Sequence, residues 1–252
     1  MKLLLTLSYL GTDFCGYQVQ NNARTVQGEL NAAAKALFGT ECDITGCSRT
    51  DSGVHANCFC ATVTERGLGG LETRIDVSRI PMAMNAHLPS DISVLSAKFV
   101  EDDFHPRYDV QYKEYVYRIC NTPVRNPFEE GRAWHIPFVY DEETVARMNE
   151  AANAFVGEHD FSAFMASGSS VESTVRHVKY ARVERVGDLI NFTVAADGFL
   201  YNMVRIMTGT LVAVAQNRIK PCEIGAIIAS KDRKNAGQTA PAEGLYLNRV
   251  VY

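Results

Sequence analysis

One short polar stretch of the sequence has residue types suited to catalysis. It reads Gly46-Cys47-Ser48-Arg49-Thr50-Asp51-Ser52-Gly53-Val54-His55-Ala56. The stretch is too polar for a buried strand and too short for a helix, whereas the residues on both sides of it are typical of strands. It is therefore predicted to be a loop between two strands, which is a rigid support for a reactive side chain.

Asp51 is the candidate catalytic residue of this loop, because a carboxylate can act as a nucleophile or as a general base. Thr50 and Ser52 are expected to form short local hydrogen bonds, and Gly53 permits a positive φ. Arg49 lies two residues from the carboxylate. The alternative is an ordinary turn, in which Asp-Ser-Gly is common, so the catalytic interpretation needs support from elsewhere in the chain.

Arg205 lies in the most apolar predicted helix, residues 200–215. A buried guanidinium needs an acidic partner, because an unpaired buried charge is costly. We expect Asp51 to be that partner. The alternative is that Arg205 faces solvent together with Asn202.

Tyr115 and Leu245 complete the set of candidate site residues. Tyr115 shares one face of a predicted strand with Tyr117, where it is either a core residue or a surface on which a base stacks. Leu245 follows a connection of small residues, 236–244, and such connections can line a pocket.

The predicted elements have the order β-α-β-β-α-β twice. In the first half they are a strand at 3–9, a helix from the Thr25 cap to Gly39, strands on both sides of the Asp51 loop, a short helix at 77–84 and a strand at 92–99. In the second half they are a strand at 112–119, a helix at 142–155 after Asp141, a hairpin of 175–186 and 189–195, helices at 200–215 and 222–230, and a strand at 245–251.

This order predicts an α+β fold made of two ferredoxin-like (RRM-like) halves, residues 1–105 with the Asp51 loop and residues 106–252. The strands are expected to form a continuous antiparallel sheet with the helices on one face. A central active-site cleft is expected between the halves.

The composition is that of a globular protein, with 252 residues of which 46% are hydrophobic and 21% charged. No apolar run has the length of a membrane span, and the N-terminal stretch lacks a cleavage site, so a cytoplasmic protein without membrane association is expected. The seven cysteines are scattered without a C-x-x-C pair. We expect reduced thiols, with neither zinc nor disulfides.

The formal net charge of −4 arises in the first half, since residues 1–105 carry 8 Lys and Arg against 12 Asp and Glu, and the rest carries 17 of each. Binding to phosphates would therefore depend on a local basic patch. The candidate phosphate contacts are Arg176, Lys179, Arg182, Arg185, Lys231, Arg233 and Lys234, although solvated surface charge explains such residues equally well.

The stretch from Arg49 to Ala56 resembles the signature of the TruA-type tRNA pseudouridine synthases. The resemblance extends over almost the whole chain, through Tyr9-Leu10-Gly11-Thr12-Asp13-Phe14-Cys15-Gly16-Tyr17-Gln18, Thr25-Val26-Gln27-Gly28-Glu29-Leu30, Phe104-His105-Pro106-Arg107, Lys113-Glu114-Tyr115-Val116-Tyr117, His159-Asp160-Phe161-Ser162-Ala163-Phe164, Met203-Val204-Arg205 and the stretch from Lys231-Asp232-Arg233 through Leu247. Two positions depart from it: Tyr17, where the family usually has Trp, and Pro106, where a small residue is common.

The resemblance implies that uridines at positions 38, 39 and 40 in the anticodon stem-loop of tRNA are isomerised to pseudouridine by a homodimer without a metal or organic cofactor. It implies that Asp51 acts on the nucleotide, as a nucleophile or as a base that gives a glycal intermediate. Arg49 would fill the gap left by the rotated base, Tyr115 and Leu245 would pack on its two sides, and Tyr115 would help to remove the proton from carbon 5.

Two other classes of protein fit parts of the sequence. Thr50-Asp51-Ser52-Gly53 is similar to the loop of aspartic hydrolases, but that chemistry needs two carboxylates that share a proton, and Arg49 is close by. A non-catalytic RNA-binding module would use aromatic residues on the sheets and would not need Asp51.

Overall fold

The computed structural model describes residues 1–168 and 171–252. The chain forms two compact units, Met1–Gln111 with Leu247–Tyr252 (unit 1) and Tyr112–Tyr246 (unit 2). Within the described residues, ten strands form a large, mostly antiparallel sheet, in which one short pair of strands is parallel. The predicted α+β class is therefore confirmed.

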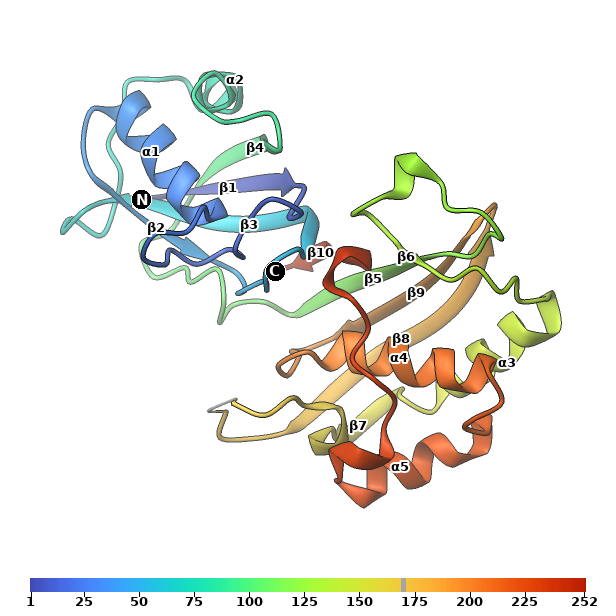
Figure 1. The fold of residues 1–252 in the computed structure, drawn as a ribbon. Helices are drawn as coiled ribbons and strands as arrows, with labels where there is room; N and C mark the ends of the chain where they lie inside the picture. Colours follow the sequence, from blue (N-terminus) through green and yellow to red (C-terminus); the bar gives the residue numbers. More distant parts are fainter. Residues whose placement is uncertain (169–170) are drawn as a thin grey trace. The chain divides into compact units, whose positions relative to one another are not determined.

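Unit 1 has the predicted order β-α-β-β-α-β. Its elements are β1 (Lys2–Tyr9), α1 (Val26–Phe38), β2 (Cys42–Gly46), β3 (His55–Glu65), α2 (Ile80–Asn85) and β4 (Ile92–Val100), joined by the end of β10 (Leu245–Val251). The strand order β4-β1-β3-β2 is antiparallel throughout, with α1 and α2 on one side of it (Figure 1). This is the ferredoxin-like arrangement.

Local sequence explains the first helix of unit 1. The Thr25 side chain accepts a hydrogen bond from the Gly28 amide, and Gly39 ends the helix in the left-handed conformation with φ of 73°. The predicted helix at 77–84 instead consists of a 3-10 turn, Val77–Arg79, followed by α2. Pro81 at the start of α2 suits a helix N-terminus, where its missing amide hydrogen costs little.

Unit 2 repeats the same order with additions. Its elements are β5 (Tyr112–Cys120), β6 (Trp134–His135), α3 (Glu142–Asn153), β7 (Gly157–Asp160), β8 (Val175–Val186), β9 (Leu189–Ala196), α4 (Met203–Ala215) and α5 (Ile224–Ser230), followed by the start of β10. The strands lie in the order β5-β9-β8-β7, with β6 beside β5, and Figure 1 shows the three helices together on one side of them. The strands β6 and β7 were not predicted.

Burial governs α4. All of its residues except Arg205 are buried, which is typical of a helix surrounded by protein on every side. The helix begins at Met203 and not at Leu200, because Asn202 adopts a left-handed conformation with φ of 60° and interrupts the helical backbone.

Among the described residues, no helix is long and apolar enough to cross a membrane.

Candidate active site

The Asp51 loop connects β2 and β3, as predicted. At its start the Cys47 amide donates to the carbonyl of Cys60 on β3 over 2.8 Å, so the strand pairing continues into the loop. The Val54 amide donates to the Asp51 carbonyl over 3.2 Å, and Gly53 has φ of +79°. Asp51 therefore occupies a tight turn that requires glycine two residues later, and its side chain is partly exposed.

A second segment, Gly11–Tyr17, which we call the clamp segment, holds this turn. The Tyr17 amide donates to the Thr50 carbonyl over 3.1 Å. The Ser52 hydroxyl and the Gly53 amide both donate to the Phe14 carbonyl, over 3.1 and 3.4 Å. The side chains of Ser52 and Thr50 thus bond to residues that lie far away in the sequence, Phe14 and Tyr9.

Glycines allow the clamp segment to approach the Asp51 loop closely. A Cβ atom on Gly11 would lie 2.0 Å from the carbonyl oxygen of Val54, and one on Gly16 would lie 2.7 Å from that of Thr50. Gly16 also has φ of +88°, which other residues rarely adopt. The glycines of the clamp segment are therefore required by backbone packing around Asp51, a role that the sequence alone did not reveal.

Buried side chains fasten the same region. The hydroxyl groups of Tyr9 and Thr50 are 2.8 Å apart and hydrogen bonded. His55 is fully buried, and its Nδ1 atom accepts a hydrogen bond from the Gly11 amide over 2.9 Å. The Tyr17 ring stacks on Phe59, with 4.4 Å between ring centroids. Arg49 differs from these residues because it is exposed on the surface of the loop.

In unit 2, Tyr115 lies on β5 opposite Val194 of β9. Its side chain is 7% exposed, and its ring meets that of Phe199 edge to face at 4.9 Å between centroids. Tyr117 shares the same face of β5, because side chains alternate along a strand. Both tyrosines thus form part of a packed surface within unit 2.

Arg205 projects from the first turn of α4 toward the chain at 240. Its Nε atom donates to the Ala240 carbonyl over 2.7 Å, and its Nη1 atom donates to the Asn202 side chain over 2.6 Å. Burial raises the pKa of Tyr117 far above its usual value, and the nearby charge of Arg205 works against that rise. The Tyr117 hydroxyl donates to the carbonyl of Pro241, so Arg205 and Tyr117 hold adjacent residues of one segment.

The segment before Leu245 joins these residues. The Tyr117 hydroxyl donates to the Pro241 carbonyl over 2.7 Å, and Gly244 packs so closely that a Cβ atom there would lie 2.6 Å from the Tyr117 ring. In unit 2, Arg205 and Tyr117 thus hold adjacent residues of this segment, and Leu245 follows Gly244 directly. Tyr115 lies two residues from Tyr117 on the same face of β5. Arg49 and Asp51 belong to unit 1, and the pairing of Asp51 with Arg205 stays a prediction.

Contacts with α4 fix the connection 236–244. The Gly237 amide donates to the Thr210 hydroxyl over 2.9 Å, and a Cβ atom on Gly209 would lie only 1.8 Å from the Gln238 carbonyl oxygen. Arg233 donates to the Thr239 hydroxyl over 3.1 Å. The connection is therefore a fixed wall of unit 2, in keeping with its small residues.

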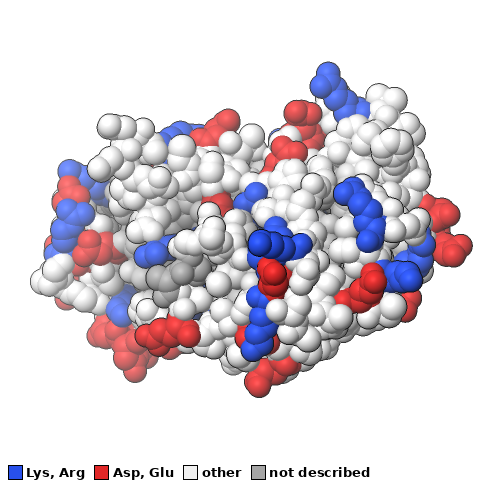
Figure 2. All heavy atoms as spheres, turned by 60° about the horizontal axis from the view of Figure 1, so that its bottom comes forward, with Lys and Arg blue, Asp and Glu red and all other residues white. Residues whose placement is uncertain are grey.

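Several candidate phosphate contacts have partners within unit 2. Arg185 bonds to Glu142 at 2.9 Å and to the Tyr140 carbonyl at 2.6 Å, and Lys231 bonds to Asp160 at 2.9 Å. The face shown in Figure 2 carries basic and acidic side chains intermixed. Arg185 in particular serves the internal structure of its unit.

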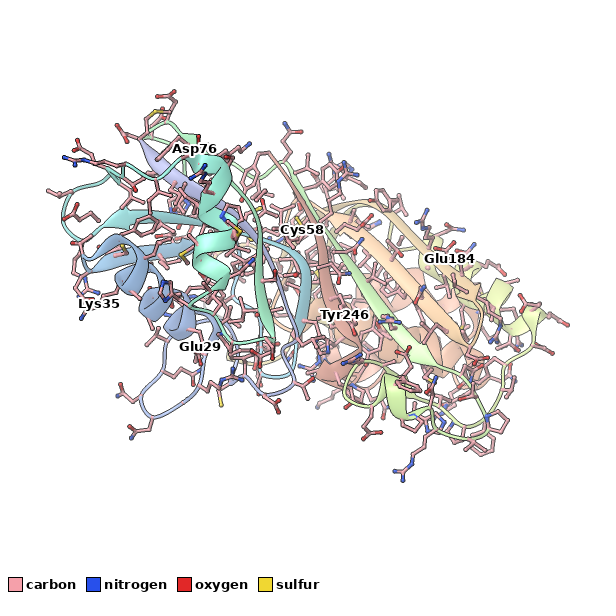
Figure 3. All side chains as sticks on the ribbon, turned by 90° about the horizontal axis from the view of Figure 1, so that it is seen from above. Glu29, Lys35, Cys58, Asp76, Glu184 and Tyr246 are labelled. Carbon is pink, nitrogen blue, oxygen red and sulfur yellow. The ribbon has the colours of Figure 1, made fainter. Side chains whose placement is uncertain are left out.

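Tyr246, labelled in Figure 3, is anchored to β5 and to the segment that follows it in unit 2. Its hydroxyl donates to the Arg132 carbonyl over 2.7 Å, and the guanidinium of Arg118 lies over its ring at 5.4 Å from the centroid. Arg118 also pairs with Glu129 at 3.4 Å. These contacts anchor the start of β10, and with it the neighbouring Leu245.

Known proteins are similar to this chain over its whole length. A family model described as tRNA pseudouridine synthase matches residues 6–109 and 151–252, which include Arg49, Asp51, Arg205 and Leu245. Tyr115 lies between the two matched segments. A solved structure of a Cbf5-Nop10-Gar1 complex covers 97% of this chain and 57% of that chain with a TM-score of 0.36 and 13% identity, which is too weak a likeness to bear on the fold or the site.

Three similar proteins are each named tRNA pseudouridine synthase A. The chain is 44% identical to the one from Thermoanaerobacter sp. (strain X514), with 100% of this chain and 99% of that protein covered. It is 45% identical to the one from Moorella thermoacetica, with 99% of both covered, and 43% identical to the one from Acetivibrio thermocellus, with 98% of both covered. This protein therefore belongs to the tRNA pseudouridine synthase family, and it is an isomerase.

Proposed function

We propose that the protein isomerises uridine to pseudouridine in the anticodon stem-loop of tRNA, at positions 38, 39 and 40, with Asp51 as the catalytic residue. The observation that carries this proposal is the fixed turn of Asp51, which the clamp segment holds on both sides of the carboxylate. Membership of an isomerase family argues against the aspartic hydrolase and against a module that only binds RNA.

The overall reaction is an isomerisation and needs no oxidant. The bond between carbon 1′ of the ribose and N1 of uracil breaks, the ring turns, and carbon 1′ bonds to carbon 5. The proton on carbon 5 leaves and N1 gains one, so atoms and charge balance. Asp51 can begin the reaction by attack on the nucleotide or by removal of a sugar proton.

The target base has to leave its stack before Asp51 can reach it, at a cost of a few kcal/mol. Arg49 is exposed beside Asp51 and is suited to fill the gap in the RNA. Tyr115 and Leu245 are suited to hold the base, because a stacking contact contributes about 1–3 kcal/mol. Both are rigidly packed in unit 2, so a base bound there would meet a preformed surface.

Asp51 has to be ionised for either route, and a pair with Arg205 would favour the charged form, whereas burial opposes it. The anchored guanidinium of Arg205, held at Ala240 and Asn202, is suited to this role. Replacement of Arg205 by Met should therefore slow turnover and move the acid side of its pH profile upward. An unchanged profile would dismiss the pairing.

We further propose that the protein acts as a homodimer in the cytoplasm, where its tRNA substrate is found. Sedimentation of the purified protein, alone and with tRNA, tests the dimer directly.

The function is tested with unmodified tRNA transcripts. Pseudouridine should appear at positions 38, 39 and 40 and at no other uridine. Asp51→Ala should bind the same RNA with unchanged affinity and form no pseudouridine. RNA binding without pseudouridine formation by the unaltered protein would instead identify a binding module.

A further inference from the structure

We propose that His55 is a positioning residue for Asp51. In this role His55 affects the rate of the chemical step and not the affinity for RNA. The inference rests on the proposed function in that Asp51 is taken as the catalytic residue. His55 follows the turn of Asp51 as the first residue of β3, and it is fully buried.

The hydrogen bond from Gly11 defines the state of the His55 ring. The amide of Gly11 is a donor, so the Nδ1 atom that it contacts at 2.9 Å has to be unprotonated. The ring is therefore neutral, with its proton on Nε2. A side chain with an acceptor at the position of Nδ1 is what this contact requires.

This bond holds the first residue of the clamp segment. Gly11 lies so close to the backbone of Val54 that no larger residue fits. Its amide donates to the side chain of His55, the residue after Val54. At the other end of the segment, Tyr17 donates to the carbonyl of Thr50. The clamp segment is thus fastened to both ends of the turn, with Asp51 between the two points.

The middle of the clamp segment completes the arrangement. The Phe14 carbonyl accepts from the Ser52 hydroxyl and from the Gly53 amide, the two residues after Asp51. If the bond at Gly11 is lost, the beginning of the clamp segment is released and the carbonyl of Phe14 can shift. A displacement of about 1 Å at a catalytic group can cost roughly 10²-fold in rate.

The test compares His55→Leu with His55→Asn. Asparagine places an acceptor near the position of Nδ1, whereas leucine fills the space without one. Asn85→Leu is the matched control, because Asn85 accepts from the Val94 amide over 2.7 Å and so fixes a backbone elsewhere in unit 1. Each variant is compared for the single-turnover rate on tRNA, the dissociation constant for tRNA, and the rate of amide hydrogen exchange in residues 11–17.

We expect His55→Leu to lower the single-turnover rate by 10- to 100-fold, with the dissociation constant changed by less than about twofold. His55→Asn should recover most of that rate, and Asn85→Leu should keep the rate of the unaltered protein. Exchange in residues 11–17 should become faster only in His55→Leu.

The proposal is overturned if His55→Asn is as slow as His55→Leu, if Asn85→Leu slows turnover to the same extent, or if exchange in residues 11–17 is unchanged in His55→Leu. An unaltered protein that forms no pseudouridine would refute the proposed function instead. In that case the exchange measurement still decides whether His55 holds the clamp segment.

Discussion

Gly209 allows the connection 236–244 to lie directly on α4, and its replacement by alanine should separate them. The new Cβ atom would lie 1.8 Å from the carbonyl oxygen of Gln238. The connection would have to retreat by about 1.5 Å to reach ordinary van der Waals contact. Three hydrogen bonds depend on its present place: Gly237 to Thr210 at 2.9 Å, Ala240 to the Arg205 carbonyl at 3.1 Å, and Arg205 Nε to Ala240 at 2.7 Å.

The expected magnitude follows from these contacts. Each hydrogen bond contributes about 0.5–1.5 kcal/mol, and overpacking of a fitted site costs about 1–3 kcal/mol. Against these costs, alanine in a helix interior stabilises the helix by up to about 1 kcal/mol relative to glycine. The connection either stays and is overpacked or retreats and loses the bonds, so only one of the two costs applies in full. We therefore expect Gly209→Ala to lower the free energy of unfolding of unit 2 by about 1–4 kcal/mol.

Gly225 provides the matched control, because it is an exposed helical glycine of α5 with nothing within 4 Å of an added Cβ atom. Gly225→Ala should raise stability by about 0.5–1 kcal/mol. Urea unfolding is followed by the fluorescence of Trp134, the one tryptophan of the chain, which packs edge to face on Tyr117. Equal stability of the two variants would refute the close packing described for Gly209.

Three further predictions concern single side chains. The Tyr17 hydroxyl is buried without a hydrogen-bond partner among the described residues, so Tyr17→Phe should raise the free energy of unfolding by about 1 kcal/mol in urea titrations, and a loss of stability would contradict this. Hydrogen bonds from Ser162, Thr174 and Lys231 hold the pKa of Asp160 well below its usual value, so Asp160→Asn should be less stable at pH 7. The deficit should shrink as the pH falls below about 4, whereas a constant deficit would count against it. The neighbouring Cys60 thiol lowers the pKa of Cys58 (labelled in Figure 3) below its usual value. Alkylation of Cys58 by iodoacetamide should therefore set in at lower pH than for an ordinary thiol and shift upward in Cys60→Ala, and the same pH profile in both proteins would be the opposite result.

Local signals in the sequence predicted the regular elements well. Thr25 and Asp141 cap the helices that follow them, with hydrogen bonds from the amides of Gly28 and Thr144. Such caps involve residues three positions apart, so the sequence displays them directly. The strands β6 and β7 escaped prediction because two and four residues are too few to show a period.

The hydrogen bonds that hold the candidate site residues in place could not be predicted from such local signals. His55 bonds to a residue 44 positions earlier, and Arg205 bonds to the carbonyl of a residue 35 positions later. No periodicity reports such contacts, because they depend on how the strands are ordered in each unit. The glycines at 11 and 16 were visible in the sequence, but only the structure shows which carbonyl each of them faces.

The release of tritium from tRNA labelled at carbon 5 of uridine measures the proposed chemistry most directly. Asn has nearly the shape of Asp, so Asp51→Asn should keep the turn and bind tRNA normally, but it lacks the carboxylate. We predict stoichiometric release within one turnover by the unaltered protein and none by Asp51→Asn over the same time. Release by Asp51→Asn at the rate of the unaltered protein would contradict the assignment of Asp51 as the catalytic residue.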